Sequence, residues 1–263
     1  MTAADSPPLV GIEGVTRWFK GPAGKPVEAL GPVTLDVAAG AFVAVVGPSG
    51  CGKSTLLRLI AGLDTPSAGD IRRVGVPITG PSRDVGIVFQ DHVLLPWLTV
   101  LDNVLLPAEL YELPKGAART RARQLLGSVG LSGFEGHKPA QLSGGMRQRA
   151  SICRALLAEP SILLFDEPFG ALDALTRERL SLDLAALWGD TGRTALLITH
   201  DIAEAVLLAD EVIVMTPRPG RIRERVAVDL PRPRTAATRR DPRFVEIAEH
   251  IRDLIFADWQ EAA

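Results

Sequence analysis

A glycine-rich segment near the N-terminus carries residues that could bind phosphate groups. The segment GPSGCGKST, residues 47–55, follows the apolar run FVAVV and matches G-x-x-x-x-G-K-[ST] ahead of a helical stretch. In such a loop, backbone N–H groups surround phosphates, Lys53 reaches the outer phosphates and the Ser54 hydroxyl binds Mg²⁺. A plain glycine turn is the alternative, but it does not require the complete pattern between a strand and a helix. The predicted phosphate-binding residues are Gly47, Pro48, Ser49, Gly50, Cys51, Gly52, Lys53, Ser54 and Thr55.

Two adjacent acidic residues follow a second apolar run. In SILLFDEP, residues 161–168, Asp166 and Glu167 come directly after four apolar residues. A carboxylate at the end of a buried strand is suited to hold Mg²⁺ beside bound phosphates, and we predict this role for Asp166. Glu167 is then placed to activate or orient water. Two solvated loop acids are the alternative, which the presence of a phosphate loop in the same chain disfavours.

A third segment predicts a second anion site. LSGGM, residues 142–146, opens a strongly helical stretch, and Ser143 can cap that helix by accepting a hydrogen bond from a free backbone N–H. Gly144 and Gly145 allow a ligand to approach the backbone closely, and the helix dipole favours negative charge at this end. The chain therefore has two predicted phosphate-binding segments.

Six short motifs occur in the order seen in ATP-binding-cassette (ABC) ATPases. They are the segment 47–55, Gln90, the segment 142–146, ILLFDEP (162–168), ALD (171–173) and ITHD (198–201). They resemble that family's Walker A, Q-loop, signature, Walker B, D-loop and H-loop, and the resemblance covers roughly residues 9–229. It implies ATP and Mg²⁺ as cofactors.

The resemblance also implies the roles of individual residues. Glu167 would be the general base and His200 the switch residue that contacts the γ-phosphate. Gln90 would touch Mg²⁺ and the attacking water, in addition to the metal ligands Ser54 and Asp166. Asp173 of the D-loop is included among the nucleotide-binding residues.

An aromatic residue ahead of the phosphate loop usually stacks on adenine in this family. Trp18 and Phe19 are the candidates, and because adjacent strand residues point to opposite faces, only one of them can do so. The match of VTRWF to the family pattern favours Phe19. A purely structural aromatic in the core is the alternative for either residue.

The resemblance implies partners as well. The signature of one copy acts on ATP held by another copy, so one Walker A and one signature per chain imply a head-to-tail homodimer. The run VLLPW, residues 93–97, is similar to the segment by which importer ATPases receive a transmembrane permease, which works with a substrate-binding protein. The sequence of this run resembles that of the nitrate/sulfonate/taurine branch of importers. The alternative is a soluble member of the family that acts on nucleic acid or ribosomes.

The elements that must position these residues alternate along the chain. Apolar runs predict buried strands near 42–47, 85–90, 161–167, 194–200 and 210–215, and helical patterns cover 53–61, 147–158, 174–188 and 202–208. This alternation predicts an α/β fold with a mainly parallel sheet, the P-loop NTPase core of an ABC ATPase. The segment 9–37 predicts an additional antiparallel β layer.

The chain divides into an ATPase domain and a C-terminal extension. Residues 9–229 are assigned to the ATPase domain, with an α-helical subdomain inserted at 91–141 where buried strands are missing. Residues 230–263 are assigned to an Arg/Pro-rich linker and a C-terminal helix over 244–259. The arginine-rich segment 217–243 lacks interleaved aromatic residues for base stacking, so we interpret it as a solvated, partly ion-paired segment.

Composition limits the function classes. A net charge of −2 gives no global signal for nucleic acid, and no nucleic-acid partner is predicted. Two cysteines are too few for a disulfide framework and favour a reducing compartment. Neither a secretory signal nor a run of about 20 apolar residues is evident. We therefore expect a peripheral position on the cytoplasmic side of the cell membrane, through the permease.

Overall fold

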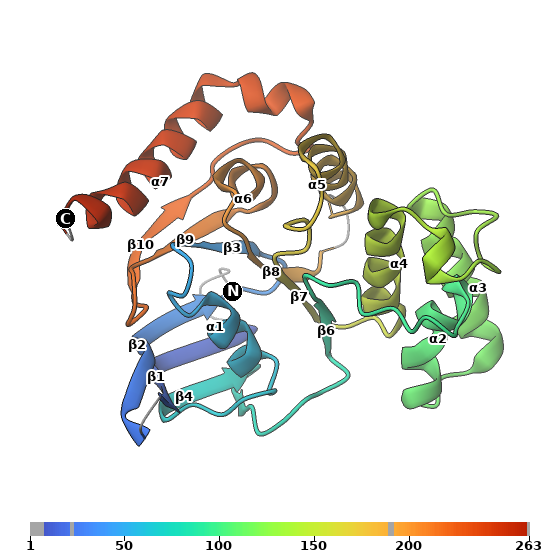
Figure 1. Cartoon of the computed structure of the whole chain (residues 1–263), viewed down its shortest axis with the longest axis horizontal. Coiled ribbons are helices and arrows are strands. Elements are labelled where there is room, and N and C mark those ends of the chain that lie inside the picture. Colours follow the sequence, from blue (N-terminus) through green and yellow to red (C-terminus); the bar gives the residue numbers. More distant parts are fainter. Residues whose placement is uncertain (1–7, 22–23, 189–191, 262–263) are drawn as a thin grey trace, which may run out of the picture.

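Two β-sheets flanked by helices make up the computed structural model of the chain, which describes residues 8–21, 24–188 and 192–261 (Figure 1). The expectation that the chain carries no secretory signal rests on an N-terminal segment whose residues 1–7 lie outside these ranges. Residues 262–263 of the C-terminal extension also lie outside them. Within the described residues, no helix has the length and apolar character needed to cross a bilayer.

The N-terminal sheet is antiparallel, as predicted. In spatial order its strands are β2 (Pro26–Val37), β1 (Val10–Lys20), β4 (Ala68–Arg73) and β5 (Val76–Pro77). The apolar side chains of Ile12, Val33 and Leu35 are buried on its inner face. Strands β4 and β5 come from outside the predicted segment 9–37, so the layer is larger than the sequence indicated.

The larger sheet carries the predicted motifs. In spatial order its strands are β10 (Ile222–Ala227), β9 (Glu211–Met215), β3 (Phe42–Val46), β8 (Thr194–Ile198), β7 (Ile162–Asp166) and β6 (Val85–Val88). Strands β9 to β6 run parallel and β10 is antiparallel to β9. All residues of β3 and β8 are buried, as expected for strands covered on both faces. Because β3, β8 and β7 are neighbours and parallel, the loops after their carboxyl ends meet at one edge.

Helices cover both faces of the larger sheet (Figure 1). Helix α1 (Lys53–Ile60) packs between the two sheets, where Leu56 and Leu57 join an apolar core with strands of both. A second core lies on the opposite face, under α5 (Ala174–Trp188), α6 (Ile202–Leu208) and α7 (Pro242–Glu261). The predicted helices 174–188 and 202–208 are confirmed at both ends.

A separate group of helices lies to one side of the sheets (Figure 1). It comprises α2 (Val100–Leu110), α3 (Lys115–Ser128), the 3₁₀ turn η2 (Pro139–Gln141) and α4 (Gly144–Leu157). Val104, Leu126 and Cys153 belong to its own apolar core. Since Cys153 lies on α4, the packing of this group extends beyond residue 141.

The arginine-rich segment is more ordered than the sequence indicated. It contains β10 and the 3₁₀ turn η3 (Ala236–Arg240), and Arg232 forms an ion pair with Asp210 at 2.6 Å. Arg234 is 4% exposed and donates hydrogen bonds to backbone carbonyls at the end of α6 and beyond β10. Burial lowers the pKa of this guanidinium to about 10. The interpretation as a solvated segment is therefore wrong for Arg234, which fastens the C-terminal extension to the core.

Candidate active site

The phosphate loop connects β3 to α1. Gly50 and Gly52 have φ angles of 78° and 101°, and a Cβ on Gly52 would lie 2.6 Å from Leu30 Cδ2, so this turn requires glycine. Lys53, the first residue of α1, is 6% exposed, and its Nζ donates to the carbonyls of Gly47 at 2.8 Å and Pro48 at 3.1 Å. The loop thus holds the Lys53 ammonium group at the start of a helix. Because a helix N-terminus also attracts negative charge, both features favour binding of an anion there.

A cavity of about 460 Å³ opens beside this loop. Predicted residues that line it are Phe19, Ser49, Gly50, Gly52, Lys53, Ser54, Thr55 and Glu167. Cys51 does not offer its side chain to a ligand there, because it is 1% exposed and burial raises the pKa of its thiol. Any contact of Cys51 with phosphate would therefore use its backbone N–H.

Phe19 forms the aromatic wall of the cavity. Its ring is 39% exposed, and the Arg17 guanidinium lies 4.7 Å from the ring centroid. Trp18 is also exposed, at 43%. Because Phe19 lines the cavity that holds Lys53, the geometry favours Phe19 for stacking on a base.

Ser54 and Asp166 form an oxygen pair that fits Mg²⁺. The Ser54 hydroxyl donates to Asp166 Oδ1 at 2.9 Å, which joins the start of α1 to the end of β7. Burial, with a smaller contribution from the charge of Glu167, raises the pKa of Asp166, while the Ser54 hydrogen bond opposes this rise. A divalent cation would compensate this buried charge. Among the described residues, no group of three or more His, Cys, Asp or Glu could hold a metal ion.

Gln90 is not part of this pair. It follows β6, and its Nε2 lies 3.6 Å from the position that a Cβ would take on Gly170. Within the described ranges it forms no hydrogen bond with Ser54 or Asp166. The structure therefore leaves the third predicted metal ligand beside the loop that follows Glu167.

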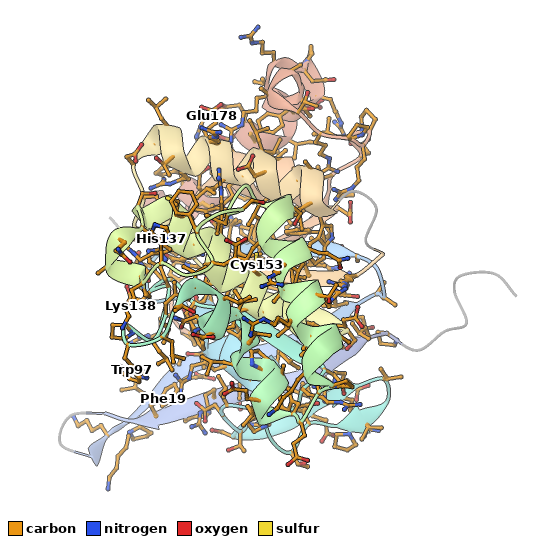
Figure 2. The ribbon with its side chains drawn as sticks, turned by 90° about the vertical axis from the view of Figure 1, so that its right-hand side faces the viewer. Phe19, Trp97, His137, Lys138, Cys153 and Glu178 are labelled. Carbon is orange, nitrogen blue, oxygen red and sulfur yellow. The ribbon has the colours of Figure 1, made fainter. Side chains whose placement is uncertain are left out.

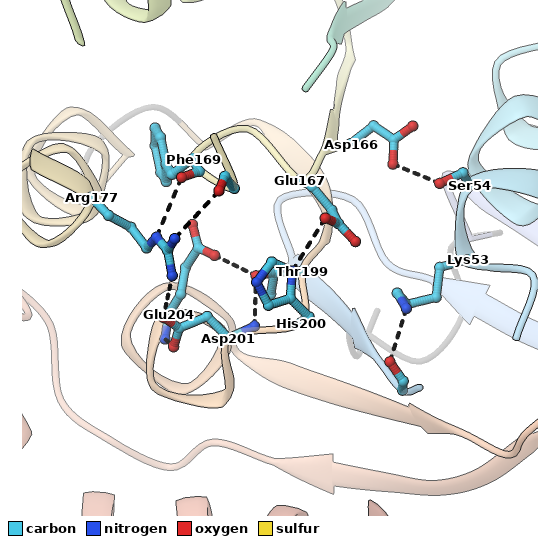
Figure 3. Close-up of polar contacts among 12 residues, drawn as sticks. Lys53, Ser54, Asp166, Glu167, Phe169, Arg177, Thr199, His200, Asp201 and Glu204 are labelled. Atoms are coloured by element: carbon cyan, nitrogen blue, oxygen red, sulfur yellow. Dashed lines mark hydrogen bonds and ion pairs between the residues drawn. The ribbon is translucent and has the colours of Figure 1, made fainter. Parts of the chain in front are cut away.

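Glu167 and His200 are brought into contact by neighbouring strands. Glu167 Oε2 lies 3.2 Å from His200 Nδ1 (Figure 3). The Glu167 N–H donates to the carbonyl of Ile198, the last residue of β8. Glu167 has a φ of 46°, which is uncommon for a residue with a side chain. This backbone turns the carboxylate toward the cavity that Lys53 and Ser54 also line.

The second predicted anion site lies elsewhere. Ser143 caps α4 by accepting a hydrogen bond from the Met146 N–H at 3.3 Å, and Gly144 is the first residue of the helix. Ser143 and Gly145 line a different cavity, of about 280 Å³, together with residues of α5. Asp173 caps α5 by accepting from the Thr176 N–H. A hydrogen bond with the Thr176 side chain, and then the one with its backbone N–H, lowers the pKa of the Asp173 carboxyl. One chain thus does not bring Ser143 to the phosphate loop.

An arginine that the motifs do not include connects the loops after β7 and β8. Arg177, on α5, donates to the carbonyls of Phe169, Gly170 and Leu172, and its Nη1 lies 3.6 Å from Asp201 Oδ2 (Figure 3). These carbonyls follow Glu167, and Asp201 follows His200. In the sequence, the one indication that Arg177 reaches these loops was its position four residues after Asp173, in the first turn of the predicted helix 174–188.

A buried glutamate completes this group. Glu204 is 3% exposed and accepts a hydrogen bond from the hydroxyl of Thr199, the residue before His200 (Figure 3). Burial raises the pKa of Glu204 to about 7. Thr199 also accepts from the Asp201 N–H, so the turn around His200 is held on both sides.

The apolar run 93–97 is partly exposed, and its backbone is held by hydrogen bonds. Val93 and Trp97 are 53% and 66% exposed, and Figure 2 shows Trp97 near Lys138, whose Nζ donates to the Trp97 carbonyl. Asn103, fully buried on α2, bonds both the N–H and the carbonyl of Leu95. The run therefore presents apolar side chains on a backbone that the helical group fixes.

Comparison with known proteins places this arrangement in a family. A family profile described as ABC transporter matches residues 30–170. The chain is 48% identical over 253 residues to the taurine import ATP-binding protein TauB of Yersinia pseudotuberculosis, which spans 94% of this chain and 97% of that protein. It is 46% identical to an uncharacterised ABC transporter ATP-binding protein of Methanocaldococcus jannaschii, over 93% of this chain and 90% of that protein.

Solved structures agree with these sequence matches. A dimeric ATP-binding cassette in a post-hydrolysis state, bound to ADP and phosphate, superposes with a TM-score of 0.73 at 35% identity, covering 84% of this chain and 99% of that chain. The protein cbiO1 of Clostridium perfringens, part of the ABC transporter complex cbiONQ, has a TM-score of 0.74 at 28% identity, covering 84% of this chain and 89% of that one.

Proposed function

The chain belongs to the ABC transporter family, and we propose that it drives an importer by hydrolysing MgATP as a head-to-tail homodimer. It is an ATPase that binds ATP together with Mg²⁺. One observation carries the mechanistic proposal: Lys53, Ser54 and Glu167 line a single cavity, and His200 is held against Glu167 at its edge.

In the proposed binding mode, the adenine stacks on Phe19 and the phosphates lie on residues 47–55. The Lys53 ammonium exchanges its carbonyl partners in the loop for phosphate oxygens. Ser54 and Asp166, already in contact, hold Mg²⁺, which when bound supplies positive charge to the phosphate oxygens. Gln90 would have to approach them from its place beside Gly170.

In the proposed reaction, Glu167 takes a proton from water as the water oxygen attacks the γ-phosphorus. The bond from the γ-phosphorus to the bridging oxygen breaks, and ADP and phosphate result. His200 holds the Glu167 carboxylate through their 3.2 Å contact and, in this proposal, also contacts the γ-phosphate. The turn from Thr199 to Asp201 limits the motion of the His200 backbone.

The homodimer supplies what one chain lacks. Ser143 and Lys53 line different cavities in one chain, so a phosphate on the Lys53 loop would need the α4 N-terminus of a second copy. No arginine finger is evident among the motifs, which leaves this helix N-terminus to stabilise negative charge in the transition state. The dimeric ATP-binding cassette that resembles this chain supports the arrangement.

A transmembrane permease, working with a substrate-binding protein, is the proposed partner on the membrane. The exposed side chains of Val93 and Trp97, three and seven residues after Gln90 in the sequence, offer an apolar surface, and the chain would lie on the cytoplasmic side through this contact. The relatives named taurine import ATP-binding proteins support taurine as the imported solute. Nitrate or another sulfonate is proposed from the resemblance of the run 93–97 alone. A role on nucleic acid or ribosomes is not favoured.

Uptake and ATPase measurements test this proposal together. Cells that lack the chain should lose uptake of radiolabelled taurine, and the unaltered chain should restore it. Trp97→Ser should fail to restore uptake while the purified variant still hydrolyses MgATP. Leu110→Ser, at a 74% exposed position on α2, is the matched control and should restore uptake. Uptake that is independent of the chain would exclude taurine as the solute.

We retain the division into an ATPase domain, residues 9–229, and an extension, residues 230–263, as a proposal. The extension is not expected to fold by itself, because Phe244, Ile247 and Ile251 of α7 are buried in the core under the larger sheet. The inserted helical subdomain, residues 91–141, would move together with α4 for the same reason.

A further inference from the structure

The loop after β9 is fixed against the phosphate loop. Gly220 donates its N–H to the Ala29 carbonyl at 3.1 Å and accepts from the Gly31 N–H at 3.0 Å, which fastens the loop to β2. A Cβ on Gly220 would lie 1.8 Å from the carbonyl oxygen of Cys51, so glycine is required for this close approach. The residues just before Gly220 are thereby held beside the turn at Gly50.

Arg218 extends from this loop to the cavity. Its Nε donates to the Gly50 carbonyl at 3.3 Å, and its Nη2 lies 3.9 Å from the position of a Cβ on Gly50. The side chain lines the same cavity as Phe19, Lys53 and Glu167. Arg218 belongs to none of the six motifs, and it comes from the segment 217–243 to which the sequence assigned no function.

The guanidinium of Arg218 is positively charged. In the described part of the chain, no carboxylate forms an ion pair with it. A guanidinium has five N–H donors, so the bond from Nε to Gly50 leaves the donors of Nη1 and Nη2 free to meet a ligand. Their planar arrangement suits two phosphate oxygens at once.

We propose that Arg218 is a second cation for the nucleotide, with its Nη groups bound to phosphate oxygens of ATP on the loop 47–55. The backbone bond to Gly50 directs the guanidinium to the turn of the phosphate loop. This inference rests on the assignment of the cavity to ATP. It adds a binding residue that the Walker A pattern does not contain.

The test is nucleotide affinity, measured by displacement of a fluorescent ATP analogue. Arg218→Gln should bind both ATP and GTP about tenfold more weakly, because a charge-assisted contact to phosphate is lost and phosphates are common to both. Arg218→Lys should recover part of the affinity. Arg221→Gln is the control within the same loop: its guanidinium packs against Gly31 and should leave affinity unchanged.

Two other results for Arg218→Gln would contradict the proposal. Unchanged ATP affinity in Arg218→Gln would show that the side chain only covers the loop, and a loss for ATP but not GTP would show a contact to the base. Lys53→Ala separates this inference from the assignment on which it rests. If Lys53→Ala keeps full affinity, the cavity itself is not the nucleotide site.

Discussion

His200 Nδ1 lies 3.2 Å from Glu167 Oε2, although 33 residues separate them in the sequence. Their contact follows from sheet order, because β7 and β8 are parallel neighbours and each residue follows the end of one strand. The two side chains thus meet at the edge of the cavity that holds Lys53. The proposed proton acceptor and its histidine partner therefore follow two neighbouring strands that are almost entirely buried.

Glu167→Gln should retain ATP binding and lose hydrolysis by at least about 100-fold. The carboxamide keeps the size of the side chain but cannot take a proton from water. With hydrolysis stopped, ATP should hold the dimer closed, which gel filtration with and without MgATP would detect. Near-normal turnover in this variant would remove Glu167 from the mechanism.

Arg177→Met should lower kcat about tenfold while ATP affinity changes less than twofold. Arg177 holds the backbone after Glu167 and pairs with Asp201 after His200, so its loss should loosen both catalytic groups but not the phosphate loop. Steady-state kinetics together with nucleotide titration would separate the two effects.

Arg232→Met is the matched control for Arg177→Met. Arg232 also binds a carboxylate and a backbone carbonyl beside α6, namely Asp210 and Leu208, and the two arginine side chains are 27% and 26% exposed. It lies at the opposite end of α6 from His200. Equal losses of kcat in both variants, matched by equal losses of thermal stability, would mean that Arg177 only stabilises the fold.

Glu204→Gln should make the protein more stable at pH 8. Burial raises the pKa of Glu204 from 4.5 to about 7, against the opposing hydrogen bond from Thr199. Asp201 raises this pKa further, and Arg177 and Arg239 lower it. Between these pH values the folded state binds more protons than the unfolded state, so this glutamate lowers the free energy of unfolding as the pH rises from 4.5 through 7.

The effect of Glu204 can reach roughly 3 kcal/mol above pH 7, because each pKa unit corresponds to about 1.4 kcal/mol. Glutamine stays neutral and can still accept from Thr199. Urea unfolding at pH 5, 6, 7 and 8 should therefore give a flatter profile for the variant than for the parent. Parallel profiles for the two proteins would show that Glu204 is not buried as a neutral acid.

The sequence predicted those parts of the fold whose signal is local. Strand β3 (FVAVV) and strand β7 (ILLFD) are short apolar runs buried on both faces, and the structure has them within one or two residues of the predicted bounds. Strand β4 (AGDIRR) was missed because Ile71 is its one buried residue, so the segment resembles a polar loop. Its pairing with β1 is a tertiary effect that local patterning does not contain.

The residues of the candidate site likewise fall into those that the sequence predicted and those that it did not. Lys53, Ser54, Asp166 and Glu167 stand in motifs at strand ends, and the sheet brings them together as the sequence implied. Arg177, Glu204 and Arg218 were not predicted, because each acts through contacts with segments distant in sequence. The third predicted metal ligand, Gln90, belongs to a motif, but within the described residues it forms no hydrogen bond with Ser54 or Asp166.

A mixed dimer tests whether the signature works across the dimer. One chain carries Lys53→Ala and the other Ser143→Arg, whose bulky cation would block the α4 N-terminus. Lys53 and Ser143 line separate cavities in one chain. In either homodimer both chains carry the same defect, so no site is intact whichever chain supplies the signature. Thr99→Arg is the control for lost capping, because Thr99 caps α2 as Ser143 caps α4, and it should keep its ATPase activity.

If the signature acts on the ATP of the partner, the mixed dimer has one whole site. It pairs the intact phosphate loop of the Ser143→Arg chain with the intact α4 N-terminus of the Lys53→Ala chain. Two different affinity tags would isolate mixed dimers, and a single-turnover assay should then show hydrolysis above both parents, without requiring two working sites. If both motifs served the same chain's ATP, every chain would be damaged and mixing would restore nothing. Isolated mixed dimers as inactive as their parents would therefore exclude the shared site.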